Sequence, residues 1–393
     1  MSEIKNSGSY VIRGNLHTPD VEIKDGILLI QDGKIQSVND HCSLAEIPPS
    51  AIVLDHRGKR VIPGLIDTHI HGAGGFDMTG KGVADAASYL PRHGVTGFLA
   101  TTHFLISRKN LLQAVVEIAD VIQSESQGAA ILGIHMEGPW IAADRSPTSK
   151  PEFCYPITRE DILAFQQASR RNLRMITFAP ELPGSLEIIP WLREQNIIPS
   201  VGHTNASYDI VKKAVDSGLN HSTHTFNAMQ PLHHRQPGTV VAILDFEQIT
   251  AELIGDGFHV QVPIMRLLIK AKGIDKVCLV SDAVPLAGLP AGTQISWHGF
   301  EIGTNGEIST LPDGRPAGAY KLLNQDIKVL VEQNVASFNA TLSMATRVPA
   351  AMLGLKKGQL KAGYDADVVI LENNYQPILT MVAGKIVYES QSS

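Results

Sequence analysis

The sequence is poor in cysteine and in long apolar runs. Its 393 residues include three cysteines, Cys42, Cys154 and Cys278, and none of them forms a C-x-x-C pair. We therefore expect neither a disulfide framework nor a cysteine-based zinc site. No apolar run approaches the roughly 20 residues of a membrane span, and the N-terminus lacks the charged-then-apolar pattern of a signal peptide. These absences predict a cytoplasmic protein that does not enter a membrane.

The chain also lacks a strong charge of either sign. With 33 Lys and Arg against 39 Asp and Glu, the net charge is −6, which gives no general reason to bind nucleic acid or an anionic membrane. A hydrophobic fraction of 44% with 18% charged residues permits a large core. The length exceeds one barrel domain of about 250 residues and leaves room for a smaller domain.

The two ends of the chain have short β-rich runs broken by turn residues. Residues 20–38 contain such runs around Asp-Gly turns, and residues 367–371 and 381–388 are similar. Neither end alone carries enough strands for an independent sheet. We therefore predict a small discontinuous β-sandwich domain built from both termini, residues 1–62 and 350–393, and a barrel domain over residues 63–349.

Strand and helix patterns alternate between these ends, which favours parallel βα units. Helices are expected over residues 110–123, 159–171 and 208–217, with Thr158 and Ser207 as N-caps and Gly218 as a stop. Eight candidate strands predict an α/β fold of the (β/α)8 barrel type, with a doubly wound sheet as the alternative. Each candidate strand ends near a histidine or an acidic residue. These residues are His71, His103, Glu137, Glu181, His203, His224, Asp256 and Asp282.

The most distinctive local pattern is the segment Pro63–Gly72, which contains His69 and His71. Residues i and i+2 of a strand point to the same side, so both imidazoles can reach one metal ion. A pair of strand-end histidines with ordinary hydrogen bonds is the alternative, because short motifs also occur by chance.

Four further ligand-type residues strengthen the metal interpretation, because each follows a predicted strand and the carboxyl ends of barrel strands converge on one face. Singly, the two acidic ones fit a helix cap or a buried ion pair equally well. The set suits zinc, iron(II), cobalt or manganese, and its size predicts one or two divalent ions, with Glu137 as the bridge between two. The predicted ligands are His69, His71, Glu137, His203, His224 and Asp282.

These motifs together are similar to those of the amidohydrolase superfamily, and within it to the family of N-acetylglucosamine-6-phosphate deacetylases. The resemblance rests on the runs P-G-L-I-D-T-H-I-H-G, H-M-E-G-P, G-H-T, H-T-F-N-A-M, D-G-F-H and S-D-A. It implies metal-dependent hydrolysis of the N-acetyl group of an amino sugar phosphate, releasing acetate and a free amine. It also implies a homodimer in which the neighbouring chain helps to bind the phosphate.

The resemblance also implies residue roles. His69, His71, Glu137 and Asp282 would surround one metal, and Glu137, His203 and His224 the second. Asp282 would take the proton of the attacking water and return it to the leaving amine.

The predicted substrate contacts are of two kinds. Asn227, Ala228 and Arg235 are expected to bind phosphate, through backbone N–H groups and the guanidinium. His259 is expected to contact the substrate and to help polarise the acetyl carbonyl.

Two segments depart from the family pattern. Ser149 stands where a substrate-binding histidine is expected, and the loop Arg315–Ala319 differs where it would close over the sugar. Arg315 or Lys150 is a hypothetical anion contact. These departures keep open a hydrolase of the same superfamily that acts on a different amide. A non-catalytic barrel protein is the third alternative.

Overall fold

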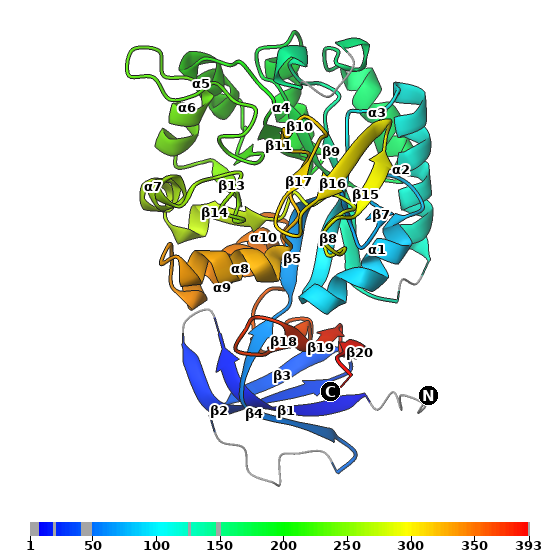
Figure 1. Cartoon of the computed structure of the whole chain (residues 1–393), viewed down its shortest axis with the longest axis vertical. Coiled ribbons are helices and arrows are strands. Elements are labelled where there is room, and N and C mark those ends of the chain that lie inside the picture. Colours follow the sequence, from blue (N-terminus) through cyan, green and yellow to red (C-terminus); the bar gives the residue numbers. More distant parts are fainter. Residues whose placement is uncertain (1–7, 19–20, 41–48, 125–126, 147–150, 392–393) are drawn as a thin grey trace.

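The computed structural model describes residues 8–18, 21–40, 49–124, 127–146 and 151–391. A barrel with its surrounding helices forms the larger part, and a smaller β domain lies below it with both chain ends (Figure 1). The boundaries predicted from the sequence, at residues 62/63 and 349/350, fall within β4 and α10, whose bounds are given below.

Eight parallel strands form the barrel in the order β14-β13-β12-β11-β10-β9-β8-β5. The Asp282 N–H donates to the carbonyl of His69 at 2.9 Å, which links the two edges of the sheet into a nearly closed barrel. The (β/α)8 prediction is confirmed, and the doubly wound alternative is wrong. The strands are β5 (Leu65–Ile70), β8 (Val95–Thr102), β9 (Ala130–Glu137), β10 (Leu173–Phe178), β11 (Ile198–Val201), β12 (His221–Ser222), β13 (Thr250–Ile254) and β14 (Val277–Val280).

Two of the helices outside the barrel begin at caps that the sequence predicts. The Thr158 hydroxyl accepts from the Asp161 N–H, and the Ser207 hydroxyl from the Ile210 N–H, as N-caps do. Gly218, with φ 112°, follows the third predicted helix in the left-handed region that favours glycine. The helices are α1 (Val83–Tyr89), α2 (Arg108–Gln123), α3 (Arg159–Ala168), α4 (Ser185–Glu194), α5 (Tyr208–Asp216), α6 (Thr239–Asp245), α7 (Val262–Lys272), α8 (Leu323–Glu332), α9 (Phe338–Ala345) and α10 (Arg347–Met352).

The β domain joins both ends of the chain, as predicted, in one seven-stranded sheet of order β20-β19-β18-β4-β1-β2-β3. The long strand β4 connects the two ends because it pairs with β1 on one side and β18 on the other. The expected sandwich is therefore one continuous sheet with a shared apolar core. The strands are β1 (Ser9–His17), β2 (Glu22–Gln31), β3 (Lys34–Asn39), β4 (Ile52–Pro63), β18 (Val368–Leu371), β19 (Pro377–Val382) and β20 (Lys385–Glu389).

One strand-like run from the sequence is in fact a hairpin. Residues 381–388 turn at Ala383 and Gly384, both with positive φ, between β19 and β20. This is the two-residue turn geometry that suits the twist of antiparallel strands.

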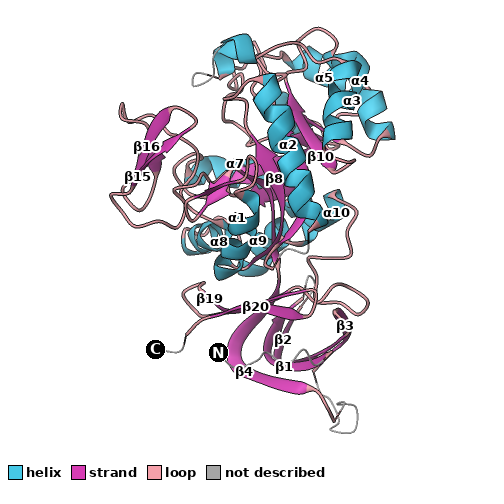
Figure 2. Ribbon diagram, turned by 90° about the vertical axis from the view of Figure 1, so that its right-hand side faces the viewer, coloured by secondary structure: helices cyan, strands magenta, loops and turns pink. Residues whose placement is uncertain are grey.

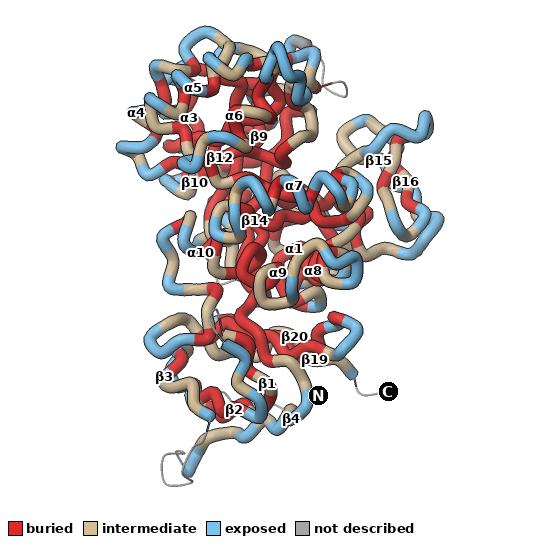
Figure 3. Tube along the Cα trace, turned by 90° about the vertical axis from the view of Figure 1, so that its left-hand side faces the viewer, coloured by how far each residue is buried: buried red, intermediate tan, exposed pale blue. Residues whose placement is uncertain are grey.

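A small antiparallel sheet that the sequence analysis did not predict follows β14. It consists of β15 (Gln294–Trp297), β16 (Phe300–Thr304) and β17 (Ser309–Thr310) and projects from the side of the barrel (Figure 2). A shorter pair, β6 (Gly72–Ala73) and β7 (Phe76–Asp77), follows β5. Buried chain runs through the barrel strands and the β domain, whereas β15 and β16 are largely at the surface (Figure 3). Within the described residues, none of the helices has the length and apolarity to cross a membrane.

Gly64, between β4 and β5, gives a test of the close packing where the chain passes from the β domain into the barrel. A Cβ there would lie 2.0 Å from Thr96 Oγ1 and 2.6 Å from Thr96 Cβ. We expect Gly64→Ala to lower the free energy of unfolding by about 1–3 kcal/mol, the usual cost of overpacking, measured by urea denaturation.

The control combines Gly64→Ala with Thr96→Gly, which removes the atoms that the new methyl group meets. Partial recovery of stability is expected. An equally unstable double variant would show that the clash is not the cause.

Candidate metal centre and active-site cavity

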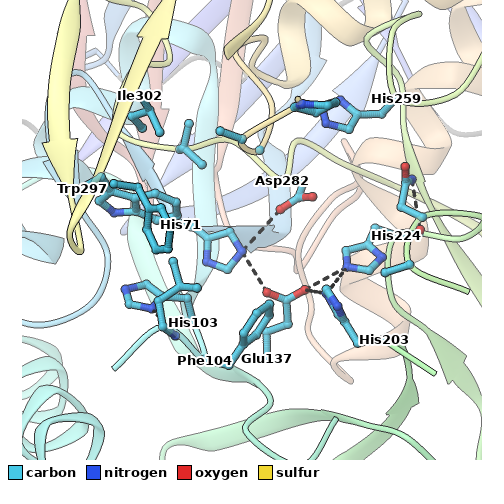
Figure 4. A pocket seen from close by; sticks show the side chains of 18 of the residues that line it. His71, His103, Phe104, Glu137, His203, His224, His259, Asp282, Trp297 and Ile302 are labelled. Atoms are coloured by element: carbon cyan, nitrogen blue, oxygen red, sulfur yellow. Dashed lines mark hydrogen bonds and ion pairs between the residues drawn. The ribbon is translucent and has the colours of Figure 1, made fainter. Parts of the chain in front are cut away.

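The six predicted ligands converge at the carboxyl end of the barrel. His69 lies near the end of β5, Glu137 is the last residue of β9, and His203, His224 and Asp282 follow β11, β12 and β14 by two residues each. Those last three residues have positive φ values of 46°, 28° and 52°. This strained backbone turns the chain sharply at the strand ends and is typical of functional sites. Figure 4 shows His71, His203, His224 and Asp282 grouped around Glu137.

The first group of donor atoms consists of His69, His71 and Asp282. The two Nε2 atoms are 3.3 Å apart, and each lies 3.4 Å from Asp282 Oδ1. Ligands about 2.0–2.1 Å from a tetrahedral ion are separated by about 3.3–3.4 Å. The spacing of this group therefore fits one divalent ion.

The second group consists of Glu137, His203 and His224. Glu137 Oε1 lies 3.0 Å from His203 Nε2 and 2.9 Å from His224 Nε2, and the two nitrogens are 3.0 Å apart. The other Glu137 oxygen, Oε2, faces His71 Nε2 at 3.2 Å. Glu137 thus has one oxygen toward each group, as a bridging ligand requires.

The hydrogen bonds around the rings decide which nitrogens carry lone pairs. His71 Nδ1 faces the Thr101 carbonyl at 3.3 Å, and His203 Nδ1 faces the Arg145 carbonyl at 2.8 Å. A carbonyl only accepts, so these Nδ1 atoms carry hydrogen, and the Nε2 atoms face Glu137. Nitrogen and carboxylate oxygen atoms converge here, and the cluster therefore needs positive charge, supplied by protons on the rings or by bound cations. The donor set therefore fits divalent metal ions.

The electrostatics of the protein alone indicate the same need. Burial would lower the pKa of His71, but hydrogen bonds to Asp282 and Glu137 raise it to about 9. Burial would raise the pKa of Glu137, but the charge of His69 and contacts with His203 hold it well below its ordinary range. The site thus keeps its carboxylates ionised and attracts cations.

A cavity of about 230 Å³ opens above these residues. Asp282 and His259 both line it (Figure 4). His259 Nδ1 is 2.7 Å from Asp256 Oδ2, and Asp256 Oδ1 also accepts from the His259 N–H at 2.8 Å. Burial lowers the pKa of His259, but the hydrogen bond to Asp256 outweighs it and raises the pKa above its usual value. The raised pKa favours the protonated form of His259, in which Nε2 can donate a hydrogen bond to a ligand.

The structure places the predicted phosphate-binding residues in two different locations. Asn227 and Ala228 line the cavity, but the Asn227 N–H already donates to the His224 carbonyl at 3.0 Å. Arg235 lies on the exposed loop 231–237 and is not among the cavity-lining residues of its own chain. Arg145, which the sequence analysis missed, does line the cavity, and its Nε donates to Asn205 Oδ1 at 2.5 Å.

The small sheet β15–β17 supplies an apolar wall that the sequence analysis also missed, with Trp297, Phe300 and Ile302. Asp77 Oδ2 anchors this sheet, because it accepts from Trp297 Nε1 at 2.8 Å and faces His298 Nε2 at 2.5 Å. An isolated aromatic between turn residues gives little sequence signal of such a role.

Of the departing segments, Pro316, Ala317 and Gly318 line the cavity as expected of that loop. The side chain of Arg315 instead pairs with Asp313 at 2.8 Å and is half exposed. Ser149 and Lys150 lie outside the described residues.

Fold and site together define a barrel hydrolase with a candidate metal centre at the carboxyl ends of its strands. The chain belongs to the amidohydrolase family, whose sequence profile it matches over residues 60–387. It is therefore a hydrolase that acts on an amide.

Individual relatives agree with this assignment. The chain is 32% identical over 384 residues to the N-acetylglucosamine-6-phosphate deacetylase of Bacillus subtilis (strain 168), covering 96% of both proteins. It is 30% identical over 384 residues to the N-acetylgalactosamine-6-phosphate deacetylase of Escherichia coli O157:H7, covering 96% of this chain and 99% of that protein.

A solved structure with this fold is a mutant N-acetyl-D-glucosamine-6-phosphate deacetylase of Mycobacterium smegmatis in complex with N-acetyl-D-glucosamine-6-phosphate. It superposes with a TM-score of 0.88 at 27% identity and covers 97% of this chain and all of that one.

Removing ligands from one donor group at a time tests the two-ion arrangement. We expect the metal-reconstituted wild type to hold two ions and His71→Ala and His203→Ala to hold one each, because each variant opens only one group. Metal content after gel filtration, measured by mass spectrometry, gives the count.

His234→Ala is the matched control, since His234 is an exposed loop histidine and its loss should leave both ions bound. Two ions in both test variants would contradict the assignment of ligands to groups.

Proposed function

We propose that this protein removes the N-acetyl group of N-acetylglucosamine-6-phosphate, or of a close amino sugar phosphate, and releases acetate and the free amine. The observation that carries the proposal is the position of Asp282. Its Oδ1 lies 3.4 Å from the Nε2 atoms of His69 and His71, and the residue also lines the cavity. The names of the relatives, which act on the phosphates of two N-acetylated sugars, support the substrate class.

The ligand roles proposed from the sequence fit this chemistry. His69, His71 and Asp282 would hold one ion, His203 and His224 the other, with Glu137 between them. When bound, a divalent ion supplies Lewis acidity, which lowers the pKa of water toward neutrality and polarises a carbonyl. Imidazole nitrogens and carboxylate oxygens suit zinc, iron, cobalt or manganese, and we propose that the metal is one of these.

Asp282 moves the proton in the proposed reaction. Burial would raise its pKa, but the charge of His69 and the hydrogen bond from His71 lower it, so the carboxylate is ionised at neutral pH. It accepts a proton from the attacking water and returns it to the departing nitrogen, so that the amide and water give acetate and amine. His259, held by Asp256, donates toward the oxygen on which negative charge develops.

Acetate release tests the reaction and the substrate together. We expect release from N-acetylglucosamine-6-phosphate and much less from the unphosphorylated sugar. Asp282→Asn should lower kcat by roughly 100- to 10,000-fold, the usual worth of a positioned acid and base.

N-acetylgalactosamine-6-phosphate belongs in the same panel, because one relative is named for it. Equal rates on phosphorylated and unphosphorylated sugars, or a fully active Asp282→Asn, would contradict the proposal.

The phosphate contact is proposed to need a second copy of the chain. Arg235 lies outside its own cavity, and the groove beside its loop is apolar, with Leu232, Ile264 and Leu267 exposed. His259 lines both the cavity and this groove. A homodimer that covers the groove would place the Arg235 loop of one chain near the cavity of the other. We also infer that the protein is cytoplasmic.

Leu267→Glu tests this assembly, because a buried unpaired charge opposes association. We expect the variant to elute as a monomer in size-exclusion chromatography with light scattering and to have a raised KM for the phosphorylated substrate. Leu163→Glu, a substitution of another exposed leucine, should leave the dimer intact. A wild-type monomer would overturn the dimer without affecting the proposed reaction.

A further inference from the structure

We propose that Glu252 is a positioning residue that fixes one ligand of each metal group with a single buried carboxylate. The inference rests on the metal centre of the proposed function and does not depend on the substrate. Glu252 lies in the middle of β13, in the run T-A-E-L-I, and is fully buried.

Three groups face the carboxylate, all within hydrogen-bond distance. His69 Nδ1 is 2.9 Å from Oε2, the backbone N–H of His224 donates to the same oxygen at 2.9 Å, and His221 Nε2 is 3.1 Å from Oε1. The first two belong to different donor groups of the metal centre. One oxygen thus connects the two groups from beneath.

The contact with His69 decides its chemistry as a ligand. An ionised carboxylate only accepts, so His69 Nδ1 carries hydrogen and the Nε2 lone pair points at His71 and Asp282. A carboxylate behind a ligating histidine fixes the tautomer and the ring orientation and increases the basicity of the ligand. Without this acceptor, the hydrogen of His69 is free to move to Nε2 and block the metal.

The contact with His224 acts on the backbone. His224 has φ 28°, an unfavourable value for a residue with a side chain. The hydrogen bond from its N–H to Glu252, together with that from the Thr225 N–H to the Glu252 carbonyl at 3.0 Å, ties this turn to β13. The ring of His224 is thereby directed at Glu137.

Glu252 also lies with His69 and His135 in a cluster of metal-ligand type, but the hydrogen bonds argue against a third ion. His135 Nδ1 faces the Thr68 carbonyl at 3.1 Å and therefore carries hydrogen. Its Nε2 is 2.7 Å from the Thr177 hydroxyl. With His69 Nδ1 also carrying hydrogen, the remaining ring lone pair, on His135 Nε2, accepts from the Thr177 hydroxyl. The role that remains for Glu252 is to hold His69 and His224 in position as ligands.

Metal titration of the full-length protein without substrate tests the proposal. Zinc affinity is measured by competition with a chromophoric chelator for wild type, Glu252→Leu and Glu252→Gln. We expect Glu252→Leu to lower the affinity for at least one zinc ion by roughly 10- to 100-fold, the usual effect of losing a residue that supports a metal ligand. Glu252→Gln retains an oxygen that can accept from His69 and His224, and it should lose less.

Asp326→Asn is the matched control. Asp326 is another fully buried carboxylate, and among the described residues neither of its oxygens has a hydrogen-bond partner. Asp326→Asn should leave zinc affinity within about threefold of wild type. If any substitution of a buried carboxylate lowered zinc affinity, the affinity would fall in Asp326→Asn as well as in the Glu252 variants.

The visible spectrum of the cobalt(II)-loaded proteins provides a readout that general destabilisation would not move. Glu252→Gln should shift the d–d bands relative to wild type, and Asp326→Asn should not. If Glu252→Leu fails to fold, Glu252→Gln decides the question. Wild-type affinities and spectra in the folded Glu252 variants would overturn the proposal, whether or not the protein releases acetate.

Discussion

Histidine Nε2 atoms and carboxylate oxygens face one another at the carboxyl end of the barrel, 2.9–3.4 Å apart. Such an arrangement is repulsive unless positive charge lies among the donors, and much of the surrounding structure keeps the donors in place. The carbonyls of Thr101 and Arg145 fix two of the rings from behind. Positive φ at three strand ends turns the ligands inward. Strained backbone of this kind is typical of functional sites.

The layer beneath the metal centre is polar, which is unusual for the interior of a small barrel filled by side chains. His135, Thr177, Ser200 and Thr223 form a hydrogen-bonded chain there, with oxygen–oxygen distances of 2.6–2.7 Å between the hydroxyls. Burial is the main cause that lowers the pKa of His135 to about 3, so this ring is neutral. A satisfied polar layer holds its members in one arrangement, and that rigidity extends to the ligands above it.

The barrel and the convergence of its candidate ligands could be predicted from sequence because both depend on local patterns. A buried strand followed by a metal-ligand residue is visible in the chain, and the His69-Ile70-His71 spacing already implies a shared direction. Caps such as Thr158 are equally local. The architecture of the β domain was harder to predict, since only the length of β4 shows that both ends join one sheet.

The residues that were missed act through distant contacts. Trp297 lines the cavity, and Asp77, 220 positions earlier, accepts its N–H. Glu252 reads as one charged residue in an apolar strand, and its partners His69 and His221 are identified only once the barrel closes. Arg235, in contrast, was predicted from its place after the N-A-M turn, but its position outside its own cavity depends on the course of the loop 231–237. Pairings over such separations leave no periodic signal.

The location of bound ions tests the central claim most directly. Crystals of the metal-loaded protein, with diffraction recorded at the absorption edge of the metal, should give two anomalous peaks on either side of Glu137, about 3.5–4 Å apart as in other two-metal sites. One peak should lie among His69, His71 and Asp282, and the other between His203 and His224. A single peak elsewhere, or none in protein shown to contain metal, would contradict the account.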